Sequence, residues 1–539
     1  MTRSINAKTL KAMINDGDEL ALIDVREAGQ YGENHMLFAV NAPYSKFEIM
    51  IGNLVPRRSV RLVLVDDDGR GDGIAEKAAR RAEELGYGDV SVLGGGVKAW
   101  NDAGYALFTG VNVPCKAFGE YVEHAYHTPS IKAEELKELF DKGENVVVLD
   151  SRPMDEFNRV CLPRGIDCPG AELAYRVHDF APDPDTLVVV NCAGRTRSII
   201  GAQSLINAGI PNRVVAFENG TMGWRLAGFE PETGQTRTYS GISDEALKIA
   251  QDRAARVRER FGIETIGKDQ LAKLKSESGT RSLYLLDVRA PDEYRAGHLS
   301  GSFMAPGGQV VQGTDQWVGT LRGRIVLIDD TSVRATMTAH WLVQLNMFEV
   351  YVLIDGLKGA ELEKGYPAPS ALGLDGANIE EMTPDQVAAA RRSGEVAVLD
   401  VGPSMDFRKA HVPSAVWGCR PALKAALAKL PQDIKKCKKI VVTSKDGLAA
   451  RLAAFDLQSQ SGVAVAVLAG GTDAWIAAGK ETESSPDTPP DNEAIDYLFW
   501  AHDRHQGNKV AMNTYLDWER DLPNQIAEDG DARFWSKPA

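Results

Sequence analysis

The chain has 539 residues, of which 44% are hydrophobic and 25% are charged. This usage is typical of globular proteins and excludes a disordered or fibrous chain, and at about 150 residues per domain the length predicts three or four domains. The 61 Lys and Arg against 75 Asp and Glu give a formal net charge of −14. A field of that sign repels nucleic-acid phosphates and anionic lipids, so we expect neither a nucleic-acid nor a membrane partner.

The N-terminus and the cysteines indicate a soluble protein of a reducing compartment. The N-terminal segment MTRSINAKTLKAMINDGDEL lacks the apolar run of a signal peptide, and no stretch approaches the ~20 apolar residues of a membrane span. The cysteines form no CxxC pair or tight cluster that would predict a zinc site or disulfides. They are Cys115, Cys161, Cys168, Cys192, Cys419 and Cys437. We therefore expect a cytoplasmic protein without a metal site.

In chain order, one pattern of apolar runs occurs four times. In each copy a first run ends in an aspartate, and a second run is followed, 42 to 44 residues after that aspartate, by one equivalent position. A third run then leads into a glycine-rich turn, as in VLGGGVKAW. The aspartates are Asp24, Asp150, Asp287 and Asp400, and the equivalent positions hold Asp67, Cys192, Asp330 and Ser444. Such regular spacing predicts four tandem copies of one domain.

Between the runs lie stretches with apolar spacing near 3.6, such as GIAEKAARRAEELGY at residues 73–87. Strands that alternate with helices predict βαβ units. The expected fold class is therefore α/β, with four tandem domains, each a mainly parallel sheet covered by helices on both faces.

The copies and the segments between them predict the domain boundaries. We expect domains at residues 1–112, 127–232, 259–370 and 377–485, a linker helix within 233–258 and a C-terminal helical tail at 486–539. The tail follows a Pro-rich stretch and is dense in aromatic residues, including Trp500, Tyr515 and Trp518. Such density predicts a tail docked on the domains, where it acts as a clasp or as a lid over the second copy.

Four features together resemble the rhodanese family. They are the D-x-R after the first strand, the motif from Glu293 and Tyr294 to His298 and Gly301, Cys192 directly after a strand, and the G-G-x-x-A-W ending. The resemblance covers most of the chain in four copies, and the arrangement is similar to four-domain bacterial thiosulfate sulfurtransferases. It implies transfer of sulfur from a small anionic donor such as thiosulfate, through a cysteine persulfide, to cyanide or a thiol. It also implies that no cofactor is needed and that a monomer or a homodimer suffices.

Cys192 is the expected nucleophile, because only the second copy has a cysteine at the equivalent position. The strand is expected to end at Asn191 and a helix to begin around Ser198, so the loop amides face inward as in an anion-binding nest. Those dipoles favour a thiolate and hold the anionic end of the donor. The predicted substrate-binding residues are Ala193, Gly194, Arg195, Thr196, Arg197 and Ser198.

Two other functions are compatible with a cysteine in this loop. A cysteine-dependent phosphatase or arsenate reductase places Arg six positions after the cysteine, but here that position is Ser198 and the arginine is Arg197. The loop is one residue short for a tetrahedral phosphate. The second alternative is a non-enzymatic scaffold or sulfur-carrier interaction protein, and it is disfavoured because the second copy keeps the whole loop.

The other three copies are expected to be inactive and structural. Asp67 and Asp330 cannot form a persulfide, and the oxygen of Ser444 is a poor sulfur acceptor. Their loops lack the paired arginines, and the first, DDDGRGDG, is strongly acidic. The alternative is that these copies bind a cationic group or a partner protein.

The remaining polar residues of the motifs are interpreted as structural. Asp150 and Arg152, and their equivalents in copies one and three, are expected to form an ion pair at the end of the strand, whereas copy four has Gly402 in place of the arginine. Cys161 and Cys168 are expected to be small core residues rather than a thiol relay. Three further residues, Cys115, His124 and His127, share a flexible linker and offer too few ligands for a metal.

Overall fold

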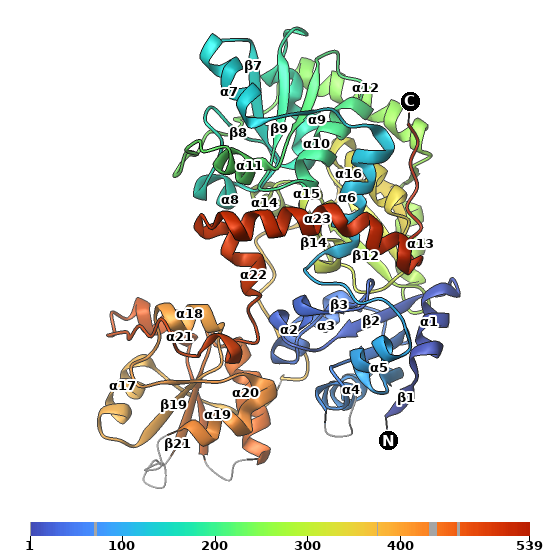
Figure 1. The fold of residues 1–539 in the computed structure, drawn as a ribbon. Coiled ribbons are helices and arrows are strands. Elements are labelled where there is room, and N and C mark those ends of the chain that lie inside the picture. Colours follow the sequence, from blue (N-terminus) through green and yellow to red (C-terminus); the bar gives the residue numbers. More distant parts are fainter. Residues whose placement is uncertain (1, 69–72, 375, 431–438, 461–463, 539) are drawn as a thin grey trace.

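The computed structural model describes residues 2–68, 73–374, 376–430, 439–460 and 464–538. It contains four five-stranded parallel sheets, one for each predicted copy, which we call repeats 1 to 4 (Figure 1). Cys437 and residues 69–72 of the acidic loop lie outside the described residues. The α/β architecture expected from the sequence is confirmed.

The strand order is the same in all four sheets. Repeat 1 has the order β1 (Arg3–Ile5), β5 (Asp89–Leu93), β4 (Arg61–Val65), β2 (Leu20–Asp24), β3 (Val40–Asn41). Repeat 2 has the order β6 (Ser130–Ile131), β10 (Val214–Phe217), β9 (Leu187–Asn191), β7 (Val146–Asp150), β8 (Ile166–Asp167). Repeat 3 has the order β11 (Glu264–Ile266), β16 (Glu349–Leu353), β15 (Arg324–Ile328), β12 (Leu283–Asp287), β14 (Phe303–Met304). Repeat 4 has the order β18 (Glu380–Met382), β22 (Ala464–Leu468), β21 (Lys439–Thr443), β19 (Val396–Asp400), β20 (Val416–Trp417). The strand ending in the conserved aspartate thus always pairs with the strand that leads to the cysteine position.

Helices cover both faces of each sheet, as parallel strands require. In repeat 2 they are α7 (Ala133–Lys142), α8 (Met154–Arg159), α9 (Gly170–Phe180), α10 (Thr196–Asn207) and α11 (Gly220–Leu226). The other repeats contribute α1 (Ala7–Asn15), α2 (Ala28–Glu33), α3 (Phe47–Leu54), α4 (Ile74–Glu84), α5 (Gly96–Asp102), α13 (Lys268–Ser276), α14 (Pro291–Ala296), α15 (Gly307–Gln312), α16 (Val333–Leu345), α17 (Pro384–Arg392), α18 (Ser404–Lys409), α19 (Leu423–Lys429), α20 (Leu448–Gln460) and α21 (Gly471–Ala477). A short antiparallel pair, β13 (His298–Leu299) with β17 (Leu362–Glu363), lies beside the sheet of repeat 3.

Two helices join the repeats. The predicted linker helix is α12 (Asp244–Phe261), which begins after the capping side chain of Ser243 and ends three residues beyond the expected boundary, where Gly262 adopts a left-handed conformation. The stretch expected to be a flexible linker is instead α6 (Val113–Tyr126). Pro114 lies in the first turn of this helix, where proline is tolerated, and the helix buries Phe118 and Val122 in the core shared by repeats 2 and 3.

The C-terminal tail is helical and docked, as the aromatic residues predict. It contains α22 (Phe499–His502), a 3-10 turn (Asp503–Gln506) and the long α23 (Lys509–Asp529). The helix α23 lies across α6, between the pair formed by repeats 2 and 3 and the sheet of repeat 1 (Figure 1). The tail therefore reaches the carboxyl end of β9, where Cys192 lies.

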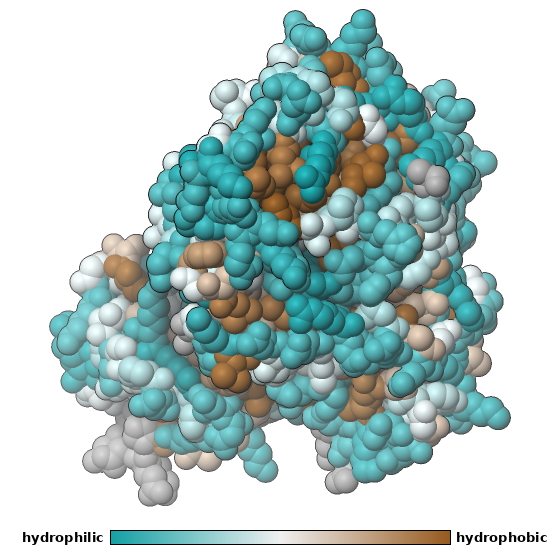
Figure 2. Space-filling view, turned by 45° about the horizontal axis from the view of Figure 1, so that its top comes forward, coloured by the Kyte–Doolittle hydropathy of each residue, from teal (hydrophilic) through white to brown (hydrophobic). Residues whose placement is uncertain are grey.

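On the face shown in Figure 2, hydrophilic residues dominate and hydrophobic side chains gather mainly in hollows. Among the described residues, no helix is long and apolar enough to cross a bilayer.

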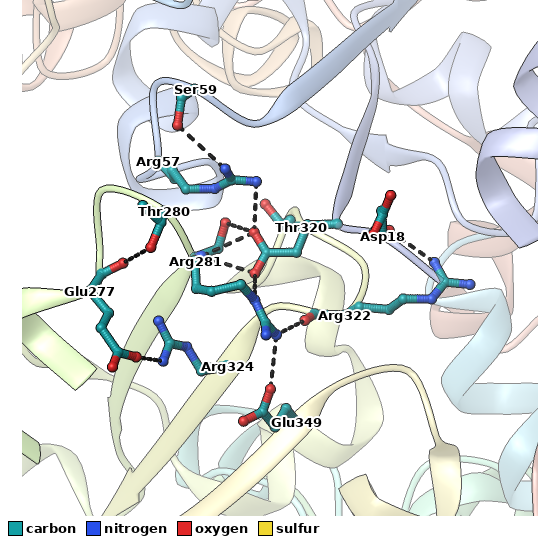
Figure 3. Close-up of polar contacts among 12 residues, drawn as sticks. Asp18, Arg57, Ser59, Glu277, Thr280, Arg281, Thr320, Arg322, Arg324 and Glu349 are labelled. Atoms are coloured by element: carbon teal, nitrogen blue, oxygen red, sulfur yellow. Dashed lines mark hydrogen bonds and ion pairs between the residues drawn. The ribbon is translucent and has the colours of Figure 1, made fainter. Parts of the chain in front are cut away.

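The buried carboxylate of Glu19 connects repeats 1 and 3, and Figure 3 shows two of its partners, Arg57 of repeat 1 and Arg281 of repeat 3. Glu19, which is 7% exposed, accepts hydrogen bonds from Arg281 Nε at 2.7 Å and from Ser282 Oγ at 2.7 Å. Its carboxylate also lies 3.0 Å from Arg57 Nη2 and accepts from the Ser282 amide. One side chain of repeat 1 thus neutralises an arginine on each side of the interface.

We expect Glu19→Ala to lower the midpoint of thermal unfolding by several degrees. Breaking a buried pair costs about 3–5 kcal/mol. Arg281 keeps Glu349 as a partner, but Arg57, which is 14% exposed, loses its carboxylate, and the buried amide and hydroxyl of Ser282 lose their acceptor. The matched control is Glu138→Ala, since Glu138 forms an exposed pair with Lys142 within one helix. Equal shifts of the two variants in a calorimetric scan would contradict this role for Glu19.

Candidate active site

Cys192 lies at the carboxyl end of β9, in the second sheet, and is 2% exposed. The strand ends at Asn191, as expected, and α10 begins at Thr196, two residues earlier than expected. The loop between them is therefore only four residues long. Such a short connection holds the cysteine sulfur close to the N-terminus of a 12-residue helix.

The backbone amides of this loop are available for an anion. The amides of Ser198 and Ile199 donate to the Arg195 carbonyl, which closes the first turn of α10. In the described part of the chain, no acceptor is recorded for the five amides from Ala193 to Arg197. Unsatisfied amides at a helix N-terminus attract negative charge. The arrangement suits a thiolate, a persulfide or the oxygens of an anionic donor.

A glycine in the turn after the third apolar run packs against the backbone of the cysteine loop. Gly220 has φ of +56°, and a Cβ at this position would lie 2.4 Å from the Cys192 carbonyl oxygen. The neighbouring amide of Thr221 donates to that same carbonyl at 2.9 Å. The glycine-rich turn of the motif therefore lets one backbone pack directly against the other, and any side chain would displace the cysteine loop.

Asp150 and Arg152 hold the strand end on which the loop depends. Arg152 Nε and Nη2 each donate to Asp150 at 2.8 Å, and Nη2 also donates to the Val160 carbonyl at 2.6 Å. The second Asp150 oxygen accepts from Asn191 Nδ2 at 2.7 Å. This buried ion pair thus fixes the residue that directly precedes Cys192.

Arg195 and Arg197, predicted to bind the donor, are both engaged by carboxylates. Arg195 forms a bidentate pair with Glu120 of α6 at 2.7 and 2.8 Å and also contacts Glu123. Arg197 forms a bidentate pair with Glu156 at 2.7 and 2.8 Å. Burial favours the neutral acid, but the Arg197 guanidinium outweighs it and lowers the pKa of Glu156 to about 2.

The two arginines still contribute to the potential at the sulfur. Burial lowers the pKa of Arg197, but the charges of Glu156 and of a Cys192 thiolate outweigh it and raise the pKa. The thiolate acts on Arg152 in the same direction. Since the guanidinium groups of Arg195 and Arg197 are held by carboxylates, the loop amides rather than these two side chains are free to contact an anion directly.

A pocket of about 110 Å³ lies over Cys192 and is roofed by the tail. Its floor is the loop from Cys192 to Arg197, and its walls come from α6, α11 and the segment that precedes α6. The roof consists of residues of α22, the 3-10 turn and α23, namely Trp500, Ala501, His502, Arg504, Tyr515, Trp518 and Glu519. The pocket therefore admits only a small molecule.

Lys116 joins the wall to the roof. Its ammonium Nζ donates to Tyr515 Oη at 2.5 Å and to Glu519 Oε1 at 2.8 Å, and all three side chains are buried. Burial opposes both charges, but the attraction between them raises the pKa of Lys116 and lowers the pKa of Glu519. Both groups are therefore charged, and the pair ties α23 to α6.

Among the residues that the structure describes, four buried polar atoms of the pocket lining have no hydrogen-bond partner. They are Gln312 Oε1, Arg504 Nε, Trp518 Nε1 and Glu519 Oε2. An unpaired buried polar atom costs about 1–3 kcal/mol, and such atoms in a pocket are partners for a bound molecule. The two donors and two acceptors here suit a small polar substrate.

The strand register moves the expected cysteine position of repeats 1 and 3 by one residue. Asp24, Asp150 and Asp287 pair with Val65, Asn191 and Ile328, so Asp66 and Asp329, rather than the expected Asp67 and Asp330, are the equivalents of Cys192. Asp66 Oδ2 accepts from the Ala75 amide at 3.0 Å, and Asp329 Oδ2 accepts from the Ala335 amide at 3.2 Å. Asp67 and Asp330, one residue further on, pair with Arg26 at 3.0 Å and with Arg334 at 2.7 Å. Ser444 Oγ accepts from the Ala450 amide at 3.1 Å and so caps the start of α20. None of these side chains is a sulfur nucleophile.

The residues 11 positions after the aspartates are buried in all four repeats. His35, His298 and His411 each stack on an aromatic ring at 3.7–4.0 Å between ring centroids. Their Nδ1 atoms contact backbone carbonyls, which accounts for one ring nitrogen each. Cys161 occupies the same position in repeat 2, and Cys168 is also buried, with a pKa raised well above that of a free thiol by burial.

Sequence reasoning identified the loop and several roof residues, but it did not identify Lys116, Glu519 or Gln312. Lys116 lies in a segment taken for a flexible linker, and Gln312 belongs to a different repeat. The aromatic density of the tail is a sequence signal only for the helix that carries Glu519. Across the described ranges, no group of three His, Cys, Asp or Glu side chains has an arrangement suited to a metal ion.

Comparisons with known proteins agree with this geometry. A family model of the rhodanese-like domain matches residues 6–103, 132–227, 268–363 and 383–478. The crystal structure of a thiosulfate sulfurtransferase from Pseudomonas aeruginosa is 43% identical, with a TM-score of 0.92 over 99% of each chain. No curated protein matches the sequence significantly.

Shorter solved structures match single repeats. A rhodanese-related protein from Thermoplasma volcanium is 19% identical, with a TM-score of 0.17 over 19% of this chain and 97% of its own. A protein of unknown function from Rhodopseudomonas palustris, described as a possible tyrosine phosphatase, is 30% identical, with a TM-score of 0.19 over 22% of this chain and 100% of its own. Similarity at this level carries no functional argument.

Gly220→Ala should lower kcat/KM by about 100-fold, because moving a reacting group by about 1 Å has effects of that size. The matched control is Gly228→Ala, since Gly228 has φ of +87° but has open space around the position of a Cβ. Both variants carry backbone strain, and only the first has a steric clash with the Cys192 loop. Similar steady-state losses in the two variants would show that strain alone is responsible.

Proposed function

The chain belongs to the rhodanese family and is a rhodanese-type sulfurtransferase, and on that premise we propose thiosulfate as its donor and Cys192 as its persulfide carrier. Cyanide or a small thiol is the proposed acceptor. The observation that carries this proposal is a buried cysteine beside five free loop amides, at the base of a small pocket roofed by the tail. The near full-length match to a thiosulfate sulfurtransferase supports the choice of donor.

In the first half-reaction the Cys192 thiolate attacks the outer sulfur of thiosulfate. A new sulfur–sulfur bond forms, the original sulfur–sulfur bond breaks, and sulfite leaves with the electron pair. The amides of residues 193–197 hold first the anionic end of the donor and then the negative persulfide. Arg195 and Arg197 act mainly through their field, since their donors are occupied by Glu120 and Glu156.

In the second half-reaction the acceptor attacks the outer sulfur of the persulfide. Cyanide leaves as thiocyanate, or a thiolate leaves as a persulfide, and the Cys192 thiolate is regenerated in either case. The hydrogen-bonding atoms without a partner in the pocket lining support a polar molecule as the acceptor of the sulfur. The pocket volume of about 110 Å³ supports a small one.

Repeats 1, 3 and 4 are proposed to take no part in sulfur transfer. At the position of Cys192 they hold Asp66, Asp329 and Ser444, and each of these side chains accepts a hydrogen bond from a backbone amide of its own repeat. Repeat 3 also contributes to the packing of repeat 2, because Arg334 forms an ion pair with Glu172 at 2.9 Å. Asp150 and Arg152 are likewise assigned a structural role.

Treatment with thiosulfate should add one sulfur atom to the wild-type protein, and cyanide should then remove it. Cys192→Ser should gain no sulfur and have no turnover, because its oxygen cannot form a persulfide. Cys161→Ser is the matched control from the same repeat and should behave like the wild type. Intact mass spectrometry before and after each addition measures both half-reactions, and turnover by Cys192→Ser comparable to wild type would refute the assignment.

Trp500→Ala should open the roof and change acceptor selectivity. Trp500 packs against Trp518 with ring centroids 5.4 Å apart, so its removal should widen the pocket without removing a charge. We expect the ratio of kcat/KM for glutathione to that for cyanide to rise about tenfold, as expected when a steric limit of this size is relieved.

The control for this variant is Trp535→Ala. Trp535 is also in the tail, but it donates to the Val343 carbonyl and lies outside the pocket lining. An unchanged ratio in Trp500→Ala, or an equal change in both variants, would argue against the tail as the element that limits acceptor size.

A further inference from the structure

Three of the four repeats hold a guanidinium group at the same place. Arg26, Arg152 and Arg289 each pair with the strand-end aspartate two residues earlier, at 2.6–2.8 Å from Nη2. The same Nη2 donates to the backbone carbonyl eight residues further along, at 2.5–2.7 Å. These carbonyls belong to Asn34, Val160 and Gly297. The carboxylate and the carbonyl thus form one receptor for a guanidinium fork.

Repeat 4 keeps this receptor but has lost the arginine. Asp400 is 4% exposed and ends β19 as its equivalents end their strands, and Gly402 stands where the others have arginine. Asp400 accepts hydrogen bonds from the Gly402 amide at 2.8 Å and from Thr472 Oγ1 at 3.4 Å. Within the described ranges, no Lys or Arg pairs with Asp400, and no donor is recorded for the carbonyl of Ala410, the equivalent of Val160.

A cavity of about 200 Å³ occupies the place of the missing side chain. Asp400, Gly402, Phe407, Ala410 and Thr472 line it. The cavity is open to solvent at the end where the cysteine loop lies in repeat 2. A buried carboxylate therefore faces an accessible space with the dimensions of a small cation.

A second arginine is missing at the mouth of the cavity. In repeat 2, Glu156 holds Arg197, and the corresponding residues of repeat 4 are Asp406 and Ala449. Asp406 and Asp473 line the mouth, and both are exposed. Lys409 and Lys445 also lie there and are exposed, so with Asp400 the carboxylates outnumber the ammonium groups by three to two.

We propose that the cavity of repeat 4 binds a guanidinium group of a second molecule, either a small free compound or the arginine side chain of a peptide. The planar fork fits a carboxylate in two parallel hydrogen bonds, and in this site it also reaches the Ala410 carbonyl. An ammonium group lacks that fork and satisfies only one acceptor well. Repeat 4 is then a binding module beside a catalytic repeat, rather than only a structural copy.

The charge of Asp400 gives the ligand its binding energy. Burial without a cationic partner raises the pKa of Asp400 to about 7, so the empty site holds a carboxyl group that is costly to ionise. A guanidinium ligand removes that cost by supplying the charge that Arg152 supplies in repeat 2. The same contact occurs three times in this protein, so its geometry is compatible with the fold.

The test is isothermal titration of the full-length protein with methylguanidine, and with methylammonium at equal ionic strength. We expect saturable binding of one methylguanidine and binding at least about tenfold weaker for methylammonium. A Gly-Arg-Gly peptide, compared with Gly-Lys-Gly, distinguishes the peptide source from the free compound. Equal affinity for the guanidinium and the ammonium ligand, or no saturable binding of either guanidinium ligand, would overturn the proposal.

Gly402→Arg supplies a tethered guanidinium and should abolish binding. The backbone at Gly402 does not have positive φ, and a Cβ there would lie 3.0 Å from Asp400 Oδ1, so a shift of a few tenths of an ångström accommodates it. The matched control is Gly267→Arg, because Gly267 has open space and lies in repeat 3. This control should bind methylguanidine as the wild type does.

Asp400→Asn tests the carboxylate independently and should also abolish binding. Sulfur transfer at Cys192 should be unchanged in all three variants, and an unchanged far-ultraviolet circular dichroism spectrum confirms that each protein, including repeat 4, is folded. Methylguanidine binding that persists in both Gly402→Arg and Asp400→Asn would place the ligand elsewhere and overturn the proposal.

Discussion

The active site depends on the aspartate that ends the first apolar run of its repeat, which is Asp150 at the end of β7. In repeat 2, Asp150 is buried, pairs with Arg152 and holds the side chain of Asn191. Because Asn191 precedes Cys192, the position of the sulfur follows from an ion pair that is fully inside the protein. Such a pair contributes little net stability, but it fixes geometry, since breaking it leaves a buried charge. The loop above it is free to change its chemistry between repeats.

The sequence alone was sufficient for the repeats, their α/β fold and the loop around Cys192, because these features are local in the chain. The partners of Arg195 and Arg197 were not predictable in the same way. Glu120 lies in a segment that resembled a linker, and the helix there is stabilised by burial against repeats 2 and 3 rather than by its own pattern. The pairing of Lys116 with Glu519 joins residues about 400 positions apart, and no local signal encodes it.

The repeats without cysteine have changed in different ways. In repeat 1, Asp67 turns towards Arg26, so an arginine that belongs to the scaffold becomes shared with the loop. In repeat 3, Arg334 gathers Glu172, Glu293 and Asp330, and so the former site becomes an interface with repeat 2. In repeat 4, and among the residues that the structure describes, the strand-end aspartate has no cationic partner. The three repeats without a cysteine thus differ in structure on one fold.

The roof over Cys192 also has a consequence for the order of synthesis. Domains of a nascent chain fold from the N-terminus onward, and repeat 2 is complete long before α23 is made. The roof can therefore cover the cysteine loop only after α23 has been synthesised and Lys116 of α6 has paired with Glu519 of α23.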